Sequence, residues 1–306
     1  MAETLDAWLA ERAAPELAAA LGALAEGVAG LAARLAGTGA LPDAERVIAR
    51  WLPGSGIRCV SAHGREAVEA DPNGRLALAL EPLEGDPDLG AAGTIFSLRP
   101  AAAGAPEASF LTPGTGILAA GAALYGPRGR LALALGGAAQ GFTLNPDAGF
   151  EAAGDPPAIP QESPLIATEA GELRRWDRPL RLYVEDCLAG ADGPRAADHD
   201  LFWSGCLTAE LHRLLARGGL LLAPSGAPRL PSLIHHAQPL AFIAESAGGT
   251  ATDGTRRILD VTPRSLGATS ALVVGSPAPV ARVAAYHDLP DSETSPLFGQ
   301  RGLFRF

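Results

Sequence analysis

Apolar residues recur along the first part of the chain with the period of an amphipathic helix. Between residues 4 and 36, large apolar side chains lie three and four positions apart, and Pro15 interrupts the pattern. Such spacing places these side chains on one helical face, so we predict a pair of packed helices. A shorter helix is predicted over residues 42–52, where Pro42 and Asp43 mark the start and a Pro-Gly pair follows the end.

The middle of the chain contains shorter apolar runs that predict strands. Residues 75–81 alternate leucine with alanine and end at an acid, and residues 57–61 form a strand candidate before them. Further strands are predicted at 94–98, 118–125, 130–135 and 141–144. A Gly-Pro-Arg-Gly segment at 126–129 lies between two of these runs and predicts a hairpin turn.

Helical and strand patterns alternate towards the end of the chain. Helices are predicted at 177–190, 205–217 and 238–247, and strands at 219–223, 257–261 and 270–275. A proline-rich stretch at 151–165 predicts a linker between this part and the earlier strands. We therefore expect an N-terminal unit over residues 1–165 and a C-terminal α/β unit over residues 166–306. The order of elements indicates a layered α+β or α/β protein.

Composition limits the partners that this chain can have. Hydrophobic residues make up 47% of its 306 residues, which is enough for a large buried core. The formal net charge is -10 and the sequence has no lysine, so the chain is a poor match for nucleic acid or for an anionic membrane. For the same reason, binding a phosphorylated metabolite would need a divalent cation or a local arginine cluster to reverse the field.

The three cysteines, Cys59, Cys187 and Cys206, are not arranged as a CxxC pair. They allow at most one disulfide, and three buried thiols in a reducing compartment are the favoured interpretation. The N-terminal region has no basic start followed by a compact apolar run, and charged residues interrupt its apolar stretch. We therefore expect a soluble cytoplasmic protein with no signal peptide and no membrane-spanning segment.

An acidic turn follows the strand predicted at 75–81. Its sequence is Glu81-Pro-Leu-Glu84-Gly-Asp86-Pro-Asp88, so four acids fall within eight residues. Because proline and glycine constrain the turn, its carboxylate oxygens can converge on a small volume, and Mg²⁺ and Mn²⁺ prefer such oxygen cages. A solvated acidic turn is the alternative that this segment alone leaves open.

Several segments, in the same order, resemble the class 1 fructose-1,6-bisphosphatase family. In that family an Asp-Pro-Leu-Asp-Gly-Ser-Ser motif is followed by Gly-Thr-Ile-Phe-Ser, and here Glu81-Pro-Leu83-Glu84-Gly85 precedes Gly93-Thr-Ile-Phe-Ser97. The other matching segments are Phe110-Leu-Thr-Pro-Gly114, Gly141-Phe-Thr-Leu-Asn-Pro146, Ala209-Glu-Leu-His-Arg213 and Gln238-Pro-Leu-Ala-Phe-Ile-Ala-Glu-Ser-Ala-Gly-Gly249. The similarity is colinear over nearly the whole chain.

The resemblance implies a fold, a reaction and a set of site residues. The fold is the α/β sugar phosphatase fold, layered α/β/α/β/α, and the reaction is hydrolysis of fructose 1,6-bisphosphate to fructose 6-phosphate and phosphate with Mg²⁺ or Mn²⁺. Members of the family usually form homotetramers, so we expect a homo-oligomer. Carried over by position, the metal ligands are Glu81, Leu83, Glu84 and His236, the catalytic acids are Glu45 and Glu84, and the substrate-binding residues are Gly85, Asp86 and Arg229.

The sequence also departs from the family pattern around the metal site. Residues 61–63, Ser-Ala-His, stand where two acids complete the site, and His236 stands where the family has a glutamate ligand. Imidazole suits zinc, iron or manganese better than magnesium. Asp86 replaces a serine that holds the phosphate, and the lysine that grips the sugar phosphate is absent. Arg229 lies beside the place of that lysine and can substitute for it, because guanidinium binds phosphate well.

Two functional hypotheses follow from the sequence. The first is a sugar-phosphate phosphatase with an altered metal site, and the second is a catalytically impaired homologue that binds a phosphosugar or regulates an active subunit.

Single residues leave alternatives open as well. His212 either pairs structurally or contacts phosphate, His235 is interpreted as a partly buried histidine, His236 is either that or a metal ligand, and Asp253 is interpreted as a turn residue.

Overall fold

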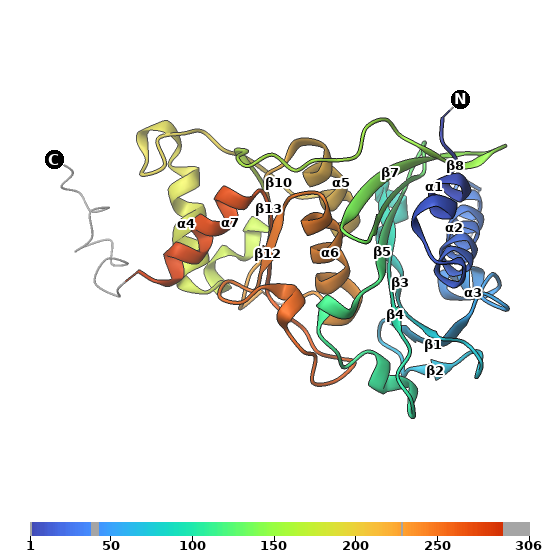
Figure 1. Ribbon diagram of the computed structural model, residues 1–306. Helices are drawn as coiled ribbons and strands as arrows, with labels where there is room; N and C mark the ends of the chain where they lie inside the picture. The colour runs from blue at the N-terminus through green and yellow to red at the C-terminus, as the bar shows by residue number, and fades with distance from the viewer. Residues whose placement is uncertain (1, 38–42, 228, 290–306) are drawn as a thin grey trace.

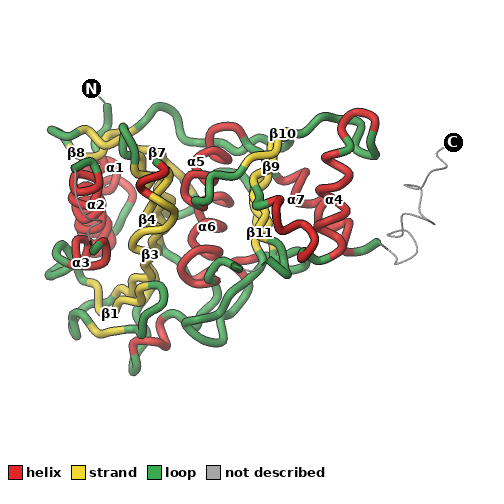
Figure 2. The backbone as a smooth tube through the Cα atoms, turned by 180° about the vertical axis from the view of Figure 1, so that it is seen from behind, coloured by secondary structure: helices red, strands yellow, loops and turns green. Residues whose placement is uncertain are grey.

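The computed structural model describes residues 2–37, 43–227 and 229–289. Its elements form five layers (Figure 1), which follow one another in the same order when the molecule is seen from behind (Figure 2). Three helices cover one face of a large sheet, two helices lie between this sheet and a smaller one, and two more cover the far face of the smaller sheet. The predicted α/β/α/β/α layering is therefore confirmed.

The large sheet has eight strands in the order β2-β1-β3-β4-β5-β6-β7-β8. All neighbouring strands in it are antiparallel except β1 and β3, which are parallel. Its strands are β1 (Ile57–Ala62), β2 (Val68–Glu69), β3 (Leu76–Asp86), β4 (Ala91–Pro100), β5 (Ala119–Tyr125), β6 (Arg130–Leu135), β7 (Ala138–Asn145) and β8 (Gly149–Ala152).

The smaller sheet has five strands in the order β10-β9-β11-β13-β12. They are β9 (Leu165–Ala167), β10 (Asp200–Phe202), β11 (Leu220–Ala223), β12 (Thr250–Thr252) and β13 (Leu272–Gly275). The helices are α1 (Leu5–Arg12), α2 (Pro15–Leu35), α3 (Ala44–Ala49), α4 (Arg178–Leu188), α5 (Leu207–Arg217), α6 (Gln238–Ser246) and α7 (Pro277–His287).

Three apolar cores separate the layers. The first joins α1, α2 and α3 to one face of the large sheet, through residues such as Leu24, Ile48 and Phe96. The second fills the space between the sheets around α5 and α6, and the third lies between the small sheet and the outer helices α4 and α7. Successive residues of a strand point to opposite faces. In β6 the leucines therefore face the first core and the alanines the second, whereas in β3 the alanines face a fourth, smaller core that includes Phe110. This explains the Leu-Ala alternation of these two strands.

Helix α2 is 21 residues long and apolar enough, by length and composition alone, to cross a membrane. Length and composition alone are weak evidence, because core helices pass the same test, and Glu16, Glu26 and Arg34 interrupt the apolar stretch as noted from the sequence. In the structure one side of α2 packs on the large sheet and on α1 and α3, and its buried residues include Leu21, Leu24, Val28 and Leu31. Such packing is typical of a core helix, whose apolar face is covered by protein.

Most sequence-predicted elements are present, and the errors concern short segments. The strand predicted at 257–261 is wrong, because Ile258–Asp260 form a 3₁₀ turn. Ile258 and Leu259 are adjacent and both belong to the core between the sheets, whereas adjacent residues of a strand would point to opposite faces. The pattern also missed the strands β2, β8, β9, β10 and β12 and one longer element, helix α7. Pro42, the predicted start of α3, lies outside the described residues.

The proline-rich stretch separates the strands of the two sheets. Strand β8 ends at Ala152, β9 begins at Leu165, and residues 153–164 form no helix or strand. However, α6 contacts strands of both sheets. The two halves of the chain therefore share a core, and their division into units at residues 165 and 166 stays a prediction.

Candidate active site

The acidic segment lies at the end of β3, where a β-bulge reorients its side chains. Glu81 pairs with Ile95 of β4 and Glu84 pairs with Gly93, so three steps on β3 match two steps on β4. Residues two positions apart in a strand face the same side, and the bulge therefore brings both glutamates to one face of the sheet. The carbonyl of Pro82 inside the bulge accepts a hydrogen bond of 2.6 Å from the Thr94 hydroxyl.

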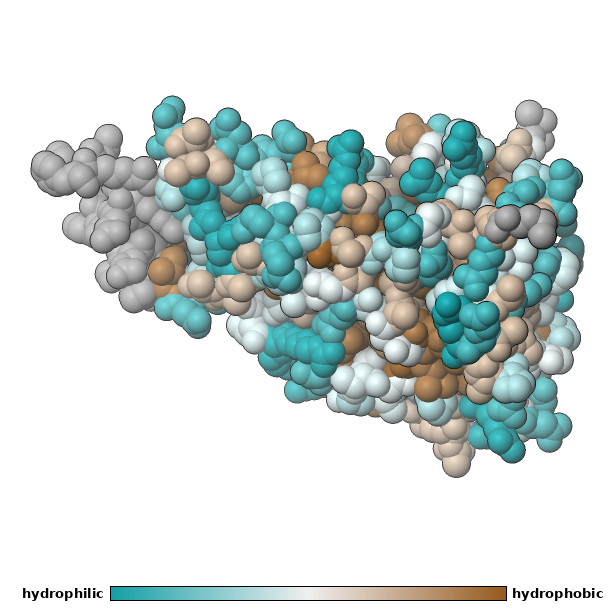
Figure 3. Space-filling model, turned by 45° about the horizontal axis from the view of Figure 1, so that its top comes forward, coloured by the Kyte–Doolittle hydropathy of each residue, from teal (hydrophilic) through white to brown (hydrophobic). Residues whose placement is uncertain are grey.

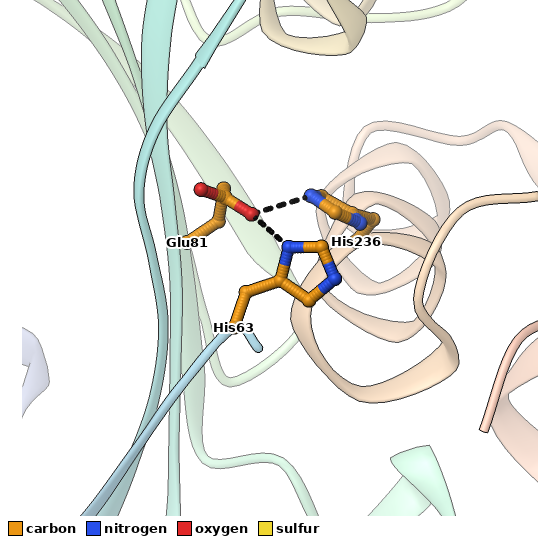
Figure 4. A group of neighbouring side chains, drawn as sticks. All are labelled: His63, Glu81 and His236. Atoms are coloured by element: carbon orange, nitrogen blue, oxygen red, sulfur yellow. Dashed lines mark hydrogen bonds and ion pairs between the residues drawn. The ribbon is translucent and has the colours of Figure 1, made fainter. Parts of the chain in front are cut away.

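Glu81 meets two histidines that come from different elements (Figure 4). His63 follows β1, and its Nδ1 lies 2.5 Å from Oε2 of Glu81. His236 lies on a π-helical turn, Leu233–Ala237, that leads into α6, and its Nε2 lies 3.0 Å from the same oxygen. The three side chains offer ligand atoms that all lie within 4.8 Å of one another. We call these residues the His63–Glu81–His236 cluster.

The cluster fixes the charge of its carboxylate. Burial raises the pKa of Glu81, but hydrogen bonds from His236 and His63 outweigh this effect and lower that pKa to about 2. The hydrogen bond to Glu81 in turn raises the pKa of His63 above its usual value. Glu81 is therefore ionised at neutral pH, with only 7% of its surface exposed.

A second row of hydrogen bonds holds His236 in one tautomer. The backbone N–H of Ser232 donates to Nδ1 of His236 over 3.0 Å, so this nitrogen carries a lone pair and the proton of the ring is on Nε2. Nε2 then donates to Glu81. The neighbouring His235 is buried and bridges the hydroxyls of Ser61 and Ser232. Burial lowers the pKa of His235 to about 3. His235 is thus more deeply buried than the sequence interpretation had it, and its contacts with the two serine hydroxyls are structural.

Glu84 points away from the cluster to the N-terminus of α5. Its carboxylate accepts hydrogen bonds from the backbone N–H groups of Leu207 (3.0 Å) and Thr208 (2.5 Å) and from the thiol of Cys206 (3.4 Å). The first N–H groups of a helix have no partner within the helix and favour a negative charge nearby. The carboxylate thus replaces a side-chain cap, which Cys206 at the N-cap position does not provide.

A cavity of about 540 Å³ opens in front of the cluster. Its floor is formed by the cluster, Leu83 and Glu84, and its walls include Trp176 and Trp203. Arg229 is the arginine among the described residues that line it, and Glu169 and Glu172 add two further acids. The cavity therefore has an acidic and imidazole-rich floor, aromatic walls and one guanidinium group.

Several of the sequence-predicted residues meet at this cavity and others do not. Glu81, Leu83, Glu84, His236 and Arg229 all line it, as the carried-over assignments require.

Glu45, Gly85 and Asp86 are not among the residues that line the cavity. Glu45 lies in the first turn of α3 and forms an ion pair with Arg65 at 3.4 Å. Asp86 accepts hydrogen bonds from the backbone of Asp88 and Leu89 and so caps its own turn. The roles predicted for these residues stay predictions.

His63 is the site residue that sequence reasoning missed. It was noted only as part of the segment in which the family's acids are lost. A histidine one residue beyond a strand parallel to β3 was nevertheless a usable signal, because parallel neighbours end at the same edge of a sheet. His212, by contrast, donates from Nε2 to the carbonyl of Ala122, and Asp253 accepts hydrogen bonds within its own turn. The contact of His212 decides for the structural one of its two alternatives, and the interpretation of Asp253 as a turn residue is confirmed.

Comparison with known proteins identifies relatives of the chain. A protein-family model described as "Fructose-1-6-bisphosphatase, C-terminal domain" matches residues 159–288. The class 1 fructose-1,6-bisphosphatase of Paracoccus denitrificans is 39% identical over 322 aligned positions, which cover 96% of this chain and 97% of the relative. A protein of the same name from Cereibacter sphaeroides is 41% identical and covers 83% of the chain.

The chain belongs to the class 1 fructose-1,6-bisphosphatase family. The solved structures agree on the fold: the fructose-1,6-bisphosphatase of Leishmania major superposes with a TM-score of 0.87 at 22% identity, over 94% of this chain and all of that one. In this family member, then, the acidic turn, the bulge and the helix N-terminus that meet at the cavity occur within the expected fold.

Mg²⁺, the first ion that the resemblance implies, does not fit the donors of this family member. The cluster offers two imidazole nitrogens and one carboxylate oxygen, whereas Mg²⁺ requires near-octahedral oxygen ligands. The second acid, Glu84, is engaged by three donors at the α5 terminus. Mn²⁺ accepts a mixed set of ligands more readily, because it is larger and tolerates nitrogen.

Proposed function

We propose that this chain is a phosphoric monoester hydrolase that acts on a phosphorylated sugar, with fructose 1,6-bisphosphate as the substrate. The observation that carries the proposal is the agreement between family and site. A chain 39% identical to a protein named for this activity has a cavity lined by Glu81, Glu84 and Arg229 in front of a candidate metal cluster. A divalent cation, Mn²⁺ rather than Mg²⁺ of the two that the resemblance implies, is part of the proposal.

The residues of the cavity provide what phosphoryl transfer requires. This reaction depends on positioning and on electrostatic stabilisation more than on covalent help from the protein. The guanidinium of Arg229 can bind a phosphate with two parallel hydrogen bonds. Trp176 and Trp203 offer apolar walls for the carbon side of a sugar ring, and their packing excludes water from one side of the bound ester.

The net charge makes a cation necessary for this function. The four glutamates of the cavity face one arginine, and the whole chain carries -10. A sugar bisphosphate would meet a repulsive field without positive charge at the cluster. The proposed activity is therefore metal-dependent and is expected to disappear in chelator.

The test is phosphate release from fructose 1,6-bisphosphate by the full-length protein, measured with Zn²⁺, Mn²⁺ or Mg²⁺ and with EDTA. We expect metal-dependent release that falls on the order of 100-fold or more in Glu81→Gln, because that change removes the central anion of the cluster. Glu107→Gln, an exposed acid away from the cavity, is the control and should keep its activity. A folded protein with no release under any of these conditions would contradict the proposal and favour the phosphosugar-binding or regulatory homologue.

We also propose that the protein acts in the cytoplasm as a homo-oligomer, with four copies as the family expectation. Figure 3 shows one face on which hydrophilic residues predominate and hydrophobic residues are exposed in separate groups. The large hydrophobic residues exposed in the single chain include Trp51, Val68, Leu89 and Leu188. Because they come from separate segments, the proposal rests on the family expectation. Light scattering after size-exclusion chromatography tests this directly, and a monomer at micromolar concentration would contradict it.

A further inference from the structure

The donor atoms of the His63–Glu81–His236 cluster distinguish between classes of metal ion. Nδ1 of His63, Oε2 of Glu81 and Nε2 of His236 come from three separate elements and lie within 4.8 Å of one another. Two imidazoles and one carboxylate are the donor set of catalytic zinc sites and of many non-haem iron sites. Hard ions such as Mg²⁺ gain little from imidazole nitrogen and need several oxygens.

Burial gives the cluster a closed side and an open side. Glu81 and His236 are each only 7% exposed, and the tautomer of His236 is fixed by a backbone donor. The His63 side chain is 45% exposed and faces the cavity. A centre with buried ligands on one side and an accessible cavity on the other leaves room for a substrate oxygen, as catalytic metal sites require.

The charge of the cluster points to the same class of ion. Its protein ligands supply one formal negative charge, from Glu81, because the imidazoles bind metal as neutral groups. Glu84 could add a second, but its oxygens accept hydrogen bonds from Leu207, Thr208 and Cys206. With a single carboxylate, affinity has to come from metal–nitrogen bonds, which zinc and iron form strongly and magnesium does not.

We infer that the His63–Glu81–His236 cluster is a transition-metal centre that binds Zn²⁺ or Fe²⁺ in preference to Mg²⁺. The inference rests on the proposed function for the role of the metal, but the binding itself can be measured without any activity. It assigns His63 as a ligand, although the family pattern places no histidine there.

The hydrogen bonds of the cluster indicate how much each ligand contributes to metal affinity. Nε2 of His236 carries a proton, because Nδ1 accepts from the Ser232 amide. Coordination through Nε2 displaces this proton and requires the ring to release that amide, which costs part of the binding free energy. The other ring nitrogen of His63 has no hydrogen-bond partner among the described residues, so its proton can move there freely. We therefore expect His63 and Glu81 to contribute more to metal affinity than His236.

The experiment measures metal bound to the full-length protein. Chelator-stripped protein is equilibrated without oxygen against equal concentrations of Zn²⁺, Fe²⁺, Mn²⁺ and Mg²⁺, and the retained metals are counted by mass spectrometry. Binding of Co²⁺, read from its visible absorption, and its displacement by Zn²⁺ provide a second readout. We expect about one Zn²⁺ or Fe²⁺ per chain and an affinity for Mg²⁺ weaker by on the order of 100-fold or more.

Matched variants locate the site. His63→Ala should lose the retained metal and the Co²⁺ absorption, whereas His199→Ala, which removes a half-buried histidine outside the cavity, should keep both. The double change His63→Glu with His236→Glu restores oxygen ligands and should shift the preference towards Mg²⁺ and Mn²⁺. Circular dichroism confirms that each variant is folded.

The outcomes separate this inference from the proposed function. Three results would each overturn the inference. The protein could retain Mg²⁺ at least as strongly as Zn²⁺ and Fe²⁺, the folded protein could bind no metal at all, or the metal could remain bound in His63→Ala. A protein that binds zinc at the cluster but releases no phosphate would leave the inference standing and defeat the proposed function. A protein that releases phosphate but retains Mg²⁺ at least as strongly as Zn²⁺ and Fe²⁺ would overturn the inference and leave the proposed hydrolase activity standing.

Discussion

At the scale of single residues, one glycine allows close approach between the large sheet and α5, the helix whose first N–H groups bind Glu84. Gly93 of β4 pairs with Glu84 across the bulge, and a Cβ at this position would lie 2.5 Å from the side chain of Thr208 in α5. The first turn of α5 can approach the sheet this closely because residue 93 has no side chain. Close packing against α5 therefore explains why the Gly-Thr-Ile-Phe-Ser motif, which this chain shares with its family, begins with glycine.

We predict that Gly93→Ala destabilises the protein by about 1–3 kcal/mol, because the added methyl group overpacks the contact with α5. Gly141→Ala is the matched control: it lies in β7, and a Cβ there would meet nothing within 4 Å. Urea unfolding of both variants measures the difference. Equal stability of the two variants would show that α5 moves away at little cost.

At the scale of elements, α5 is attached to the large sheet by polar contacts at its first turn and at its middle. Glu84 accepts the N–H groups of its first turn, and His212 in the middle of the helix donates to the carbonyl of Ala122 in β5. The helix is amphipathic, with Leu211 and Leu214 buried between the sheets. Its position is thus determined by polar contacts at the sheet and apolar contacts around them.

We predict that Glu84→Gln lowers the free energy of unfolding by on the order of 1 kcal/mol, since the amide still accepts hydrogen bonds but lacks the charge that favours a helix N-terminus. Glu45→Gln changes a half-buried acid in the first turn of α3 that pairs with the exposed Arg65, and it should lower the free energy of unfolding by only a few tenths of a kcal/mol. Thermal or urea unfolding compares the two. An effect of Glu84→Gln no larger than that of the control would contradict the capping role.

The protonation of His212 should make stability depend on pH. Burial lowers its pKa to about 4 in the folded protein, against about 6.5 in an unfolded chain. Between these values the unfolded state binds more protons, so stability falls as the pH is lowered from about 6.5 to about 4, by up to about 3 kcal/mol.

The variant His212→Gln keeps a donor for the Ala122 carbonyl and does not titrate. It should therefore flatten the part of the pH profile that His212 causes, while His235, whose pKa is lowered to about 3, keeps a slope of the same sign. Unfolding free energies measured from pH 7 down to pH 4 decide the matter. An unchanged slope in the variant would show that His212 contributes nothing.

At the scale of the whole molecule, the two sheets depend on each other through the helical layer between them. Small residues on one face of β5 and β6, among them Ala120, Ala122 and Ala132, belong to the same core as α6 and β13. That face of the large sheet would be exposed without the second half of the chain. The cavity has the same dependence, because its lining combines Glu81 and Glu84 of β3 with residues beyond 165 such as His236.

We predict that residues 1–158 do not fold alone, because removal of α5 and α6 exposes an apolar face of the large sheet and leaves Glu84 without its helix. Circular dichroism and amide exchange of the separate segment, with the intact chain as the control, test this. A cooperative, protected fold of the segment would instead support two independent units.

The sequence by itself determined most of the elements and the family. Helices with clear apolar periods and strands with Leu-Ala alternation were predicted correctly, because local periodicity reports which face of an element is buried. Three-residue strands such as β10 and β12 could not be found in this way, since they are shorter than the pattern that defines them. The acidic turn was recognised because its residues are contiguous.

Only the tertiary structure decided which of those residues form the cluster. His63, Glu81 and His236 are far apart in the chain, and they meet because β1 and β3 are parallel neighbours and the turn before α6 packs against them. Glu81 and Glu84 are three residues apart, yet a bulge places them on the same face of the sheet. Glu84 does not contact the histidines, because its carboxylate accepts hydrogen bonds from the N-terminus of α5. Periodicity describes faces within one element, whereas ligand sets and caps depend on distances between elements, which register and packing determine.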